Sequence, residues 1–299
     1  MRDLFTIIIT TKNRIVELKK TLITVTNENY AGVKIIICDD GSNDGTFDFV
    51  KENYPDIKVL RNKKNRDLIY SRNRLMNEID TDYAISLDDD ANFLISPDYE
   101  SIVQYFEKNE KCAILGLRLY WGTSLPHQFN TEHKPHQVKS FPGGAHIIRT
   151  SAWHQIPNYP EWFKFYGEED FASFHLFKRG LEVHYYPDIL IHHRVDIKSR
   201  KKNKDYIQRT RKALRSGWYL YLMFYPLKEI PKRMIYSIWM QMKLKLFKGD
   251  FRAFFGLMMA ISDVIFNLPR VLKNSDRLTP QEFNEYMQLA DAKLYWNPC

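Results

Sequence analysis

Three clusters of acidic residues could do chemistry, and the first lies in "IICDDGSNDGT", residues 36 to 46. Asp39 and Asp40 follow an apolar, β-branched run, and adjacent carboxylates repel each other unless a hydrogen-bond donor is bound beside them. A base edge or a ribose supplies such donors, so we interpret this pair as facing a nucleoside. The alternative is a turn in which Asp44 or Ser42 caps a helix that begins at Thr46.

The second cluster, Asp88 to Asp90 in "SLDDDANF", also follows an apolar run directly. Three successive carboxylates are electrostatically costly, and a bound divalent cation is the simplest relief. Mg²⁺ and Mn²⁺ prefer oxygen ligands and commonly take one or two protein carboxylates while they bridge phosphate oxygens. Asp88 and Asp90 point the same way on an extended chain, so they form the predicted ligand pair. The alternative is a solvated acidic turn.

The third cluster, "YGEED", places Glu168, Glu169 and Asp170 at the start of a predicted helix. The helix dipole and the free N–H groups favour acids at any helix start, so a structural role is one interpretation. Beside a metal and a diphosphate, one of these acids could instead be the general base for a substrate hydroxyl. His192 and His193 follow a predicted strand and could add a metal ligand or a diphosphate donor, or be structural.

The elements that must position these clusters are buried strands alternating with amphipathic helices up to about residue 120. Runs such as "LFTIIIT", "VKIIIC", "IKVL" and "YAISL" predict strands, and "RIVELKKTLITVT" and "IYSRNRLMNEI" predict helices. This alternation is typical of an open, mostly parallel α/β sheet, in which ligands bind beyond the carboxyl ends of the strands. The polar residues at that edge are 10–13, 39–44 and 88–90.

The later part of this region predicts a further strand over 113–120 and a close backbone approach at the two glycines of "FPGGAHIIRT". "YGEEDFASFHLFKRG" predicts a helix that ends at Gly180. "LEVHYYPDILIHH" predicts two short strands around Pro187.

Charge divides the chain into residues 1–195 and a basic, aromatic-rich helical region, residues 196–299. Between Asp196 and Arg252, sixteen Lys and Arg residues stand against four acids, whereas the whole chain has a net charge of +8. One interpretation of residues 196–272 is a surface that rests on an anionic membrane. The other is a helical appendage that packs on the first region or on a second subunit.

The three cysteines, Cys38, Cys112 and Cys299, are odd in number and lack metal-ligand spacing. This fits a reducing compartment. The apolar run at the N-terminus is too short for a signal peptide or a membrane span. We therefore expect a cytoplasmic protein, with a peripheral position on the inner face of the cytoplasmic membrane if the basic region binds lipid.

The order of the motifs "TIIITTKNR", "IICDDGSNDGT", "SRN", "LDDDA", "GGA", "GEED" and "PDILIHH" resembles the inverting glycosyltransferases of family 2. The resemblance covers residues 4 to 195 and extends to bacterial polysaccharide-building and rhamnosyltransferase-like members. It implies a GT-A nucleotide-diphospho-sugar transferase fold with a C-terminal helical appendage. It also implies transfer of a sugar from a nucleotide-diphosphate donor, such as a UDP- or dTDP-sugar, to an acceptor hydroxyl with inversion.

The resemblance implies donor-binding roles for residues that match the family's motifs. Thr10 and Lys12 correspond to the loop after the first strand, and Asp40, with Asp39 beside it, corresponds to the nucleobase pair. Arg72 in "SRN" corresponds to a basic residue near the base or diphosphate. Arg66 is its rival.

The resemblance also implies a divalent cation, Mn²⁺ or Mg²⁺, and a general base. Asp88 to Asp90 match the family's Asp-x-Asp element, with Asp90 as metal ligand, Asp88 facing ribose or metal, and Asp89 sharing either task. His193 matches a histidine that often follows the family's late strand and is the third candidate ligand. The base is Glu169 or Asp170, because "GEED" offers three acids where the family commonly has two.

Three other functions compete with this interpretation. A sugar nucleotidyltransferase needs a Gly-rich phosphate loop after the first strand, and "TTKNR" has no glycine. A non-catalytic nucleic-acid-binding protein would use the basic aromatic region but would leave the acidic clusters without a purpose, so we expect no nucleic acid partner. A calcium loop starting at Asp40 would have Lys51 in place of its bidentate Glu. The expected partners are a nucleotide sugar and a glycan or lipid-linked acceptor.

Overall fold

A computed structural model of the chain describes residues 1–27, 30–196 and 202–296, so Cys299 and part of the predicted basic loop after Arg194 lie outside the described residues. Its strands form one sheet in the order β3-β2-β1-β4-β8-β6-β9-β5, with β10 beside β6 and β7 beside β9. The strands are β1 Phe5–Thr11, β2 Lys34–Asp39, β3 Lys58–Arg61, β4 Tyr83–Asp88, β5 Ala91–Phe93, β6 Cys112–Trp121, β7 His136–Val138, β8 Ala145–Arg149, β9 Glu182–His193 and β10 Tyr295–Trp296.

The first half of the sheet is parallel, as the strand-helix alternation predicted. β1 lies between β2 and β4, and Thr10 pairs in register with Cys38 and with Asp88. These registers bring the carboxyl ends of β1, β2 and β4 to one edge of the sheet. The polar residues that follow the three strands are therefore neighbours in space.

The second half of the sheet is mixed, because β8 is antiparallel to both β4 and β6. Two details differ from the sequence prediction. β9 is one strand of 12 residues, Glu182–His193, and Pro187 lies inside it at a register shift against β6, where no ladder hydrogen bond is needed from the proline. The residues after Asp90 form the short strand β5, which pairs with the end of β9.

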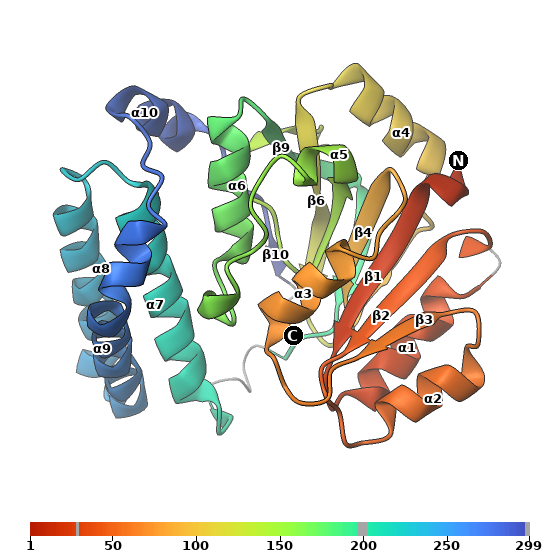
Figure 1. Ribbon diagram of the computed structural model, residues 1–299, viewed down its shortest axis with the longest axis horizontal. Helices are drawn as coiled ribbons and strands as arrows, with labels where there is room; N and C mark the ends of the chain where they lie inside the picture. The colour runs from red at the N-terminus through yellow and green to blue at the C-terminus, as the bar shows by residue number, and fades with distance from the viewer. Residues whose placement is uncertain (28–29, 197–201, 297–299) are drawn as a thin grey trace.

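Helices cover both faces of the sheet (Figure 1). One apolar layer lies beneath the first, second and fourth helices, and the other lies beneath the third, fifth, sixth and seventh. The side chains of Ile7 and Ile9 enter one layer and that of Ile8 the other, as alternation along a doubly covered strand requires. The helices are α1 Ile15–Val25, α2 Thr46–Asn53, α3 Leu68–Met76, α4 Tyr99–Lys108, α5 Thr150–Trp153, α6 Glu168–Lys178, α7 Tyr206–Phe224, α8 Ile230–Leu244, α9 Phe251–Lys273 and α10 Pro280–Gln288.

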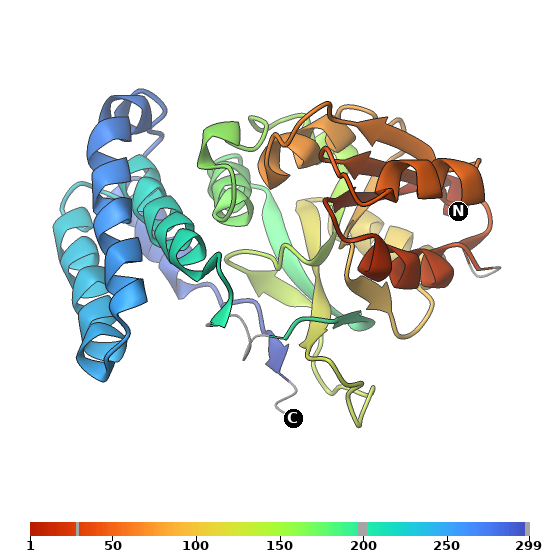
Figure 2. The same ribbon diagram turned by 90° about the horizontal axis from the view of Figure 1, so that it is seen from below.

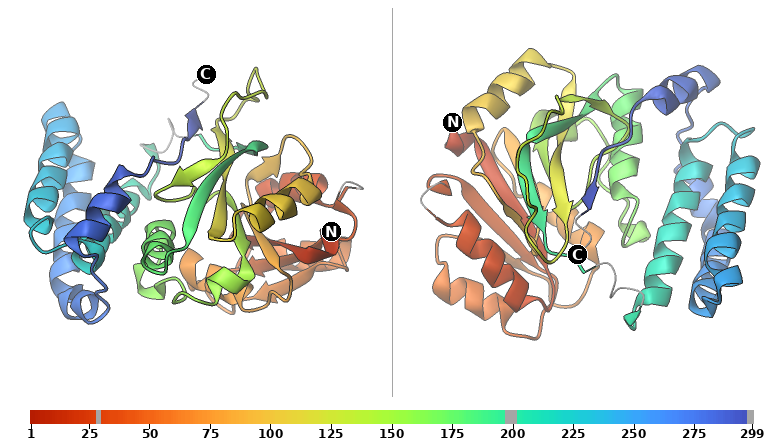
Figure 3. Two further views of the ribbon diagram at one scale, coloured as in Figure 1. Left: turned by 90° about the horizontal axis from the view of Figure 1, so that it is seen from above. Right: turned by 180° about the vertical axis from the view of Figure 1, so that it is seen from behind.

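The C-terminal region is helical, as predicted, and it is joined to the sheet domain through a shared core. The side chains of Trp218 and Phe224 on α7 belong to the same apolar layer as Phe174 on α6, and the rings of Phe174 and Phe224 stack at 4.7 Å. Figures 2 and 3 show α8 and α9 on the side of α7 away from the sheet, while the chain after α9 returns along α10 to the sheet. The division at residue 195 stays a prediction.

Cys38 and Cys112 are buried free thiols on separate strands. Burial raises the pKa of Cys38 to about 11, so both the burial and the protonated state make this thiol unreactive. These two residues act as small core side chains.

Candidate active site

The predicted acidic edge of the sheet opens into a cavity of about 470 Å³. Seven of the eleven residues assigned to the site from the sequence line it: Thr10, Lys12, Asp40, Asp88, Asp89, Asp90 and His193. Its remaining wall comes from the loop before α3, from Phe165, and from the first turns of α7. Four assigned residues are absent from the lining and are described below: Asp39, Arg72, Glu169 and Asp170.

Asp88, Asp90 and His193 each offer a possible ligand atom, and these atoms all lie within 4.8 Å of one another. The imidazole Nε2 of His193 is 3.0 Å from Asp90 and 3.6 Å from Asp88. The pairing of β5 with β9 creates this arrangement, because it sets Ala91 opposite His193. Carboxylates and imidazoles are both common ligands of divalent metal ions, and the residues present therefore fit a divalent cation.

Gly144 is required for this approach of the histidine to the sheet. Its carbonyl accepts the N–H of Asp88 at 3.0 Å, and a Cβ on Gly144 would lie 2.8 Å from Nδ1 of His193. The close backbone approach that the sequence predicted at the two glycines is present. His192, in contrast, points away from the metal ligands and contacts the carbonyl of Gly122 at 2.9 Å through Nε2, so it has a structural role.

Arg14 balances the charge of the acidic cluster, and the sequence analysis did not single it out. Its guanidinium contacts Asp89 at 3.0 Å and also donates to Asp90. Burial opposes ionisation of Asp90, but the contacts with His193 and Arg14 lower its pKa to about 2, so it stays a carboxylate. Burial raises the pKa of Asp89 to about 7 in spite of Arg14. Thr11 donates to Asp89 at 2.8 Å, which fixes that side chain against the sheet.

Asp39 and Asp40, which the sequence suggested as a joint nucleoside pair, do not both line the cavity. Adjacent side chains at a strand end point to opposite sides, and only Asp40 lines the cavity. The carboxylate of Asp39 is fully buried and accepts the N–H of Ser42 at 3.1 Å. Asp40 accepts the N–H of Arg66 and the side-chain amide of Asn62, each at 2.8 Å. The donors that relieve the repulsion therefore come largely from the protein itself.

The turn interpretation of this motif is correct for Asp44. Its carboxylate accepts the N–H of Thr46 at 3.2 Å and the N–H of Ile15 at 3.0 Å, so it supports the starts of both α1 and α2. Gly45 occupies the N-cap position of α2 with φ of +83°, a left-handed conformation that glycine adopts without strain.

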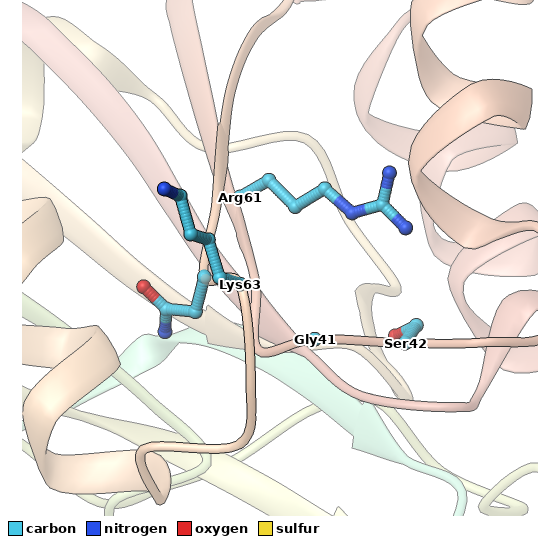
Figure 4. A pocket seen from close by; sticks show the side chains of 5 residues that line it. Gly41, Ser42, Arg61 and Lys63 are labelled. Atoms are coloured by element: carbon cyan, nitrogen blue, oxygen red, sulfur yellow. The ribbon is translucent and has the colours of Figure 1, made fainter.

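A smaller cavity of about 310 Å³ lies beside the Asp40 loop and is lined by Gly41, Ser42, Arg61, Asn62 and Lys63 (Figure 4). Gly41 has φ of +72°, and a Cβ there would lie 2.8 Å from the backbone of Lys64. The loop that carries Arg66 thus approaches the Asp40 loop closely. Arg66 itself stacks over Tyr70 at 4.0 Å in an adjoining cationic cavity of about 600 Å³.

Arg72 occupies a different position from the one that the family resemblance implied. Its guanidinium is 5% exposed, and it contacts Glu168 at 2.9 Å, Asp88 at 3.1 Å and the carbonyl of Gly143 at 2.8 Å. The helical register of α3 turns this side chain inward, behind Asp88. Burial lowers the pKa of Arg72, but the neighbouring acids raise it by more, so the net pKa is raised and the guanidinium stays charged. Arg72 is therefore a buried support of the acidic edge and does not line the cavity.

The three acids at the start of α6 point in two directions. Glu168 and Glu169 face Arg72, with Glu169 at 3.3 Å, and a Cβ on Gly143 would lie 1.8 Å from the Glu169 carboxylate. Burial, followed by repulsion from Glu168, raises the pKa of Glu169 to about 8. Asp170 is exposed on the other side of the helix, with Ser140 and Asp291 among its neighbours. Of the two predicted bases, Glu169 is the one on the side of Asp88.

α7 supplies a cationic wall opposite the acidic edge, and residue-by-residue reading of the sequence missed it. Arg209 and Lys212 both line the cavity. Arg209 contacts Asp205 at 2.5 Å, and Lys212 contacts Asp67 at 3.5 Å. Both cations lie over the ring of Phe165 at 5.8 Å. The excess of Lys and Arg after Asp196 was the available signal, but nothing local showed which of them face the cavity.

Comparisons with known proteins agree with the family resemblance. The sequence profile of the family "Glycosyl transferase family 2" matches residues 6–176. A putative glycosyltransferase, EpsE of Bacillus subtilis (strain 168), is 31% identical over 104 residues, which are 33% of this chain and 37% of that protein. The chain thus spans little more than a third of that relative.

Solved structures share the fold at low sequence identity. GalNAc-T7 with UDP, GalNAc and Mn²⁺ has a TM-score of 0.59 at 16% identity. The match covers 75% of this chain and 48% of the GalNAc-T7 chain. The mannosyltransferase PcManGT of Pyrobaculum calidifontis with GDP-Man and Mn²⁺ has a TM-score of 0.56 at 13% identity. The match covers 89% of this chain and 75% of the PcManGT chain. S. aureus TarS 1-349 with UDP-GlcNAc has a TM-score of 0.52 at 15% identity. The match covers 72% of this chain and 66% of the TarS chain.

Proposed function

This chain belongs to glycosyltransferase family 2, and we propose that it transfers a sugar from a nucleotide-diphosphate donor to an acceptor hydroxyl with inversion at the anomeric carbon. One observation carries the proposal. A single cavity has carboxylates and His193 on its sheet side and two cations of α7 on the other. A diphosphate with its cation fits between such walls, because each wall offers charge opposite to one part of that ligand.

Asp88, Asp90 and His193 are the proposed ligands of the divalent cation. When bound, Mn²⁺ or Mg²⁺ would neutralise the negative charge that develops on the departing diphosphate. Arg14 and Arg72 contact these carboxylates from outside the ligand set and hold their orientation. Two structural neighbours contain Mn²⁺, which supports this choice of cation for the fold.

The donor contacts follow from the lining of the cavity. Thr10, Lys12 and Asp40 line its side toward β1 and β2, and we assign them to the nucleoside. Arg209 and Lys212 face the diphosphate from α7 and hold it by charge-assisted hydrogen bonds. Asp89 is tied to Thr11 and Arg14, so its role is to keep the acidic edge in shape.

Glu169 is the proposed general base. It takes the proton of the acceptor hydroxyl as that oxygen attacks the anomeric carbon, and the bond from that carbon to the diphosphate breaks on the opposite side. Its pKa of about 8 lies near a neutral working pH, which suits a group that must accept a proton and release it again. The acceptor in this proposal is a hydroxyl of a glycan or a lipid-linked glycan.

A thermal-shift panel of UDP-, dTDP- and GDP-sugars, each with and without Mn²⁺, tests the proposal. A nucleotide sugar that raises the melting temperature only when Mn²⁺ is present supports the proposal and identifies the nucleobase of the donor. A sugar nucleotidyltransferase would instead respond to a nucleoside triphosphate. If neither class of ligand changes the melting temperature, the proposal is wrong.

A further inference from the structure

The outer face of the C-terminal helices is apolar. Thirteen large hydrophobic side chains between Leu227 and Leu272 are exposed, among them Phe266 at 83% and Phe251 at 65%. On α9 the exposed residues Phe251, Phe255, Met258 and Ile265 follow one another at intervals of four, three and seven residues, as one stripe of a helix does. We call this surface the outer face; it comprises the exposed residues between Leu227 and Lys273, which lie just before α8, on α8, on the turn Leu246–Lys248 and on α9.

The other side of α9 is fixed to the protein by an ion-pair network. Asp263 lies on the buried side and contacts Arg211 of α7 at 2.6 Å and Arg215 at 3.5 Å, while Tyr219 donates to its carbonyl at 3.1 Å. By length and composition α9 could cross a membrane, and it is the one helix of the described residues that could. A spanning α9 would leave Asp263 unpaired in hydrocarbon, which is costly. The structure therefore favours a helix that lies on a surface.

Charge on the outer face has a single sign. Between residues 226 and 273 the chain has nine Lys and Arg residues against three acids. All the exposed charged residues there are cations: Lys228, Lys232, Lys243, Lys248, Arg270 and Lys273. The acids are paired within the protein, as Glu229 is with Arg233 at 3.8 Å and Asp263 is with Arg211. An apolar stripe flanked by unopposed cations matches an anionic lipid surface.

We propose that the outer face binds an anionic bilayer in the plane of the membrane, with its Phe, Trp and Ile side chains in the headgroup boundary and its lysines on the lipid phosphates. A second copy of the chain is a poorer partner, because two such faces would bring their cations together. This inference goes beyond glycosyl transfer and does not depend on it.

The outer face ends close to the cavity, so membrane binding would orient the site. Tyr206, at the start of α7, donates to Asp250 at the start of α9 at 2.6 Å. Arg209 and Lys212, within the next two turns of α7, line the cavity. A lipid-linked substrate held in the bilayer would therefore meet the protein near the mouth of the site.

Flotation of the full chain with vesicles tests the proposal. The protein should float with vesicles that contain phosphatidylglycerol and remain unbound with vesicles of phosphatidylcholine alone. Binding should weaken when salt rises from about 0.1 M to about 1 M, because the Debye length falls from about 10 Å to about 3 Å. Absence of flotation with the anionic vesicles at low salt would overturn the proposal without any variant.

Two sets of substitutions separate the apolar and the cationic contributions. The first is F251S/F255S/F266S, with V16S/I23S on exposed α1 as its matched control. The second is K232E/K243E/K248E, with K51E/K108E/K111E as its control at exposed lysines elsewhere. Each cation near an anionic surface contributes about fivefold to the partitioning of a protein from water onto the membrane. The triple charge reversal should therefore lower partitioning onto the anionic vesicles more than about 100-fold. The serine set should abolish binding that survives high salt.

Both controls should float like the parent protein. If they lose binding as much as the outer-face variants do, the interaction is non-specific and the proposal is wrong. If the parent sediments as a dimer that the serine set converts to a monomer, and neither floats, the face is a contact between copies and the lipid proposal is wrong. Stabilisation by a nucleotide sugar with Mn²⁺ should remain in every variant, which distinguishes loss of this surface from failure of the proposed function.

Discussion

The two walls of the cavity are built by different means. Asp40 directly follows β2, Asp88 ends β4 and Asp90 lies two residues later, so the parallel register of β1, β2 and β4 is sufficient to bring them together. Arg209 and Lys212 stand on α7, more than 100 residues later, and reach the cavity because α7 packs its apolar side into the core. The acidic wall is thus a property of the sheet edge, and the cationic wall is a property of tertiary packing.

This difference separates two chemical tasks. The proposed cation ligands on the sheet edge are held by paired strands, which set the distances between them as a metal site requires. α7 offers long, partly exposed cations that can follow a phosphate. Substitutions on the sheet edge should therefore reduce turnover most, and substitutions on α7 should reduce donor binding.

The largest effect should come from Asp90→Asn, which removes a proposed metal ligand but keeps the size of the side chain. We expect kcat/KM to fall by about 10³-fold or more, since a catalytic cation supplies several kcal/mol of transition-state stabilisation. Release of nucleotide diphosphate in the presence of acceptor measures it. Asp56→Asn, at an exposed position away from the cavity, should behave like the parent. Parental transfer by Asp90→Asn would show that the metal assignment is wrong.

The next effect should separate the two candidate bases. Glu169→Gln should lower kcat by about 10²- to 10⁴-fold, the usual contribution of a general base, whereas Asp170→Asn should change it little. Because burial and Glu168 raise the pKa of Glu169 to about 8, the base form appears as pH rises, and kcat should climb through that pH. The pH–rate profiles of the parent and of both variants measure this, because the rise should be present in the parent and in Asp170→Asn and absent in Glu169→Gln. A larger loss of kcat in Asp170→Asn than in Glu169→Gln would show that Asp170 is the general base.

A smaller effect should follow from Arg209→Ala and Lys212→Ala on the cationic wall. Each removes one charge-assisted contact to the proposed diphosphate, so donor affinity should fall about 10- to 100-fold in calorimetric titration, and kcat should fall less. Lys204→Ala, at an exposed lysine shortly before α7, is the matched control. Unchanged donor affinity in both α7 variants would remove α7 from the site.

The smallest effect on transfer should come from Asp263→Asn, which acts on the support of α7. It leaves Arg211 and Arg215 without their carboxylate partner, and breaking such a largely buried pair destabilises a protein by about 3 kcal/mol. Urea unfolding measures the loss, and transfer should fall only a few-fold. Burial raises the pKa of Asp263, but Arg211 lowers it by more, so the net pKa is lowered. The ion pair therefore stabilises the fold at neutral pH, and this stabilisation is lost as pH falls below the usual range of an aspartate. Equal stability of parent and variant at neutral pH would contradict this account.

Local pattern was enough to predict the sheet edge and its acids. Alternating strands and helices indicated the parallel half of the sheet, and the side-chain period of a strand indicated that Asp88 and Asp90 share a side. Both lie with His193 in one ligand cluster. That third member was predicted from family position, while the physical cause, the three-residue strand β5 paired with β9, is too short for a sequence pattern to reveal.

What the sequence could not indicate depends on contacts between distant segments. Asp39 looked equivalent to Asp40, but its carboxylate is fully buried, with Arg61 of the neighbouring strand β3 at 3.7 Å. Arg72 was expected near the base or the diphosphate of the donor, but the register of α3 encloses it among acids from β4 and α6. Arg14 followed the first strand as one of several polar residues, and only the fold shows that it pairs with Asp89 and Asp90.

Calorimetric titration of the preferred nucleotide diphosphate, with and without Mn²⁺, tests the central claim that the two walls hold one metal-linked ligand. We predict binding that requires Mn²⁺, that disappears in Asp90→Asn, and that weakens about 10- to 100-fold in Lys212→Ala. Equal binding by all three proteins without Mn²⁺ would contradict the account.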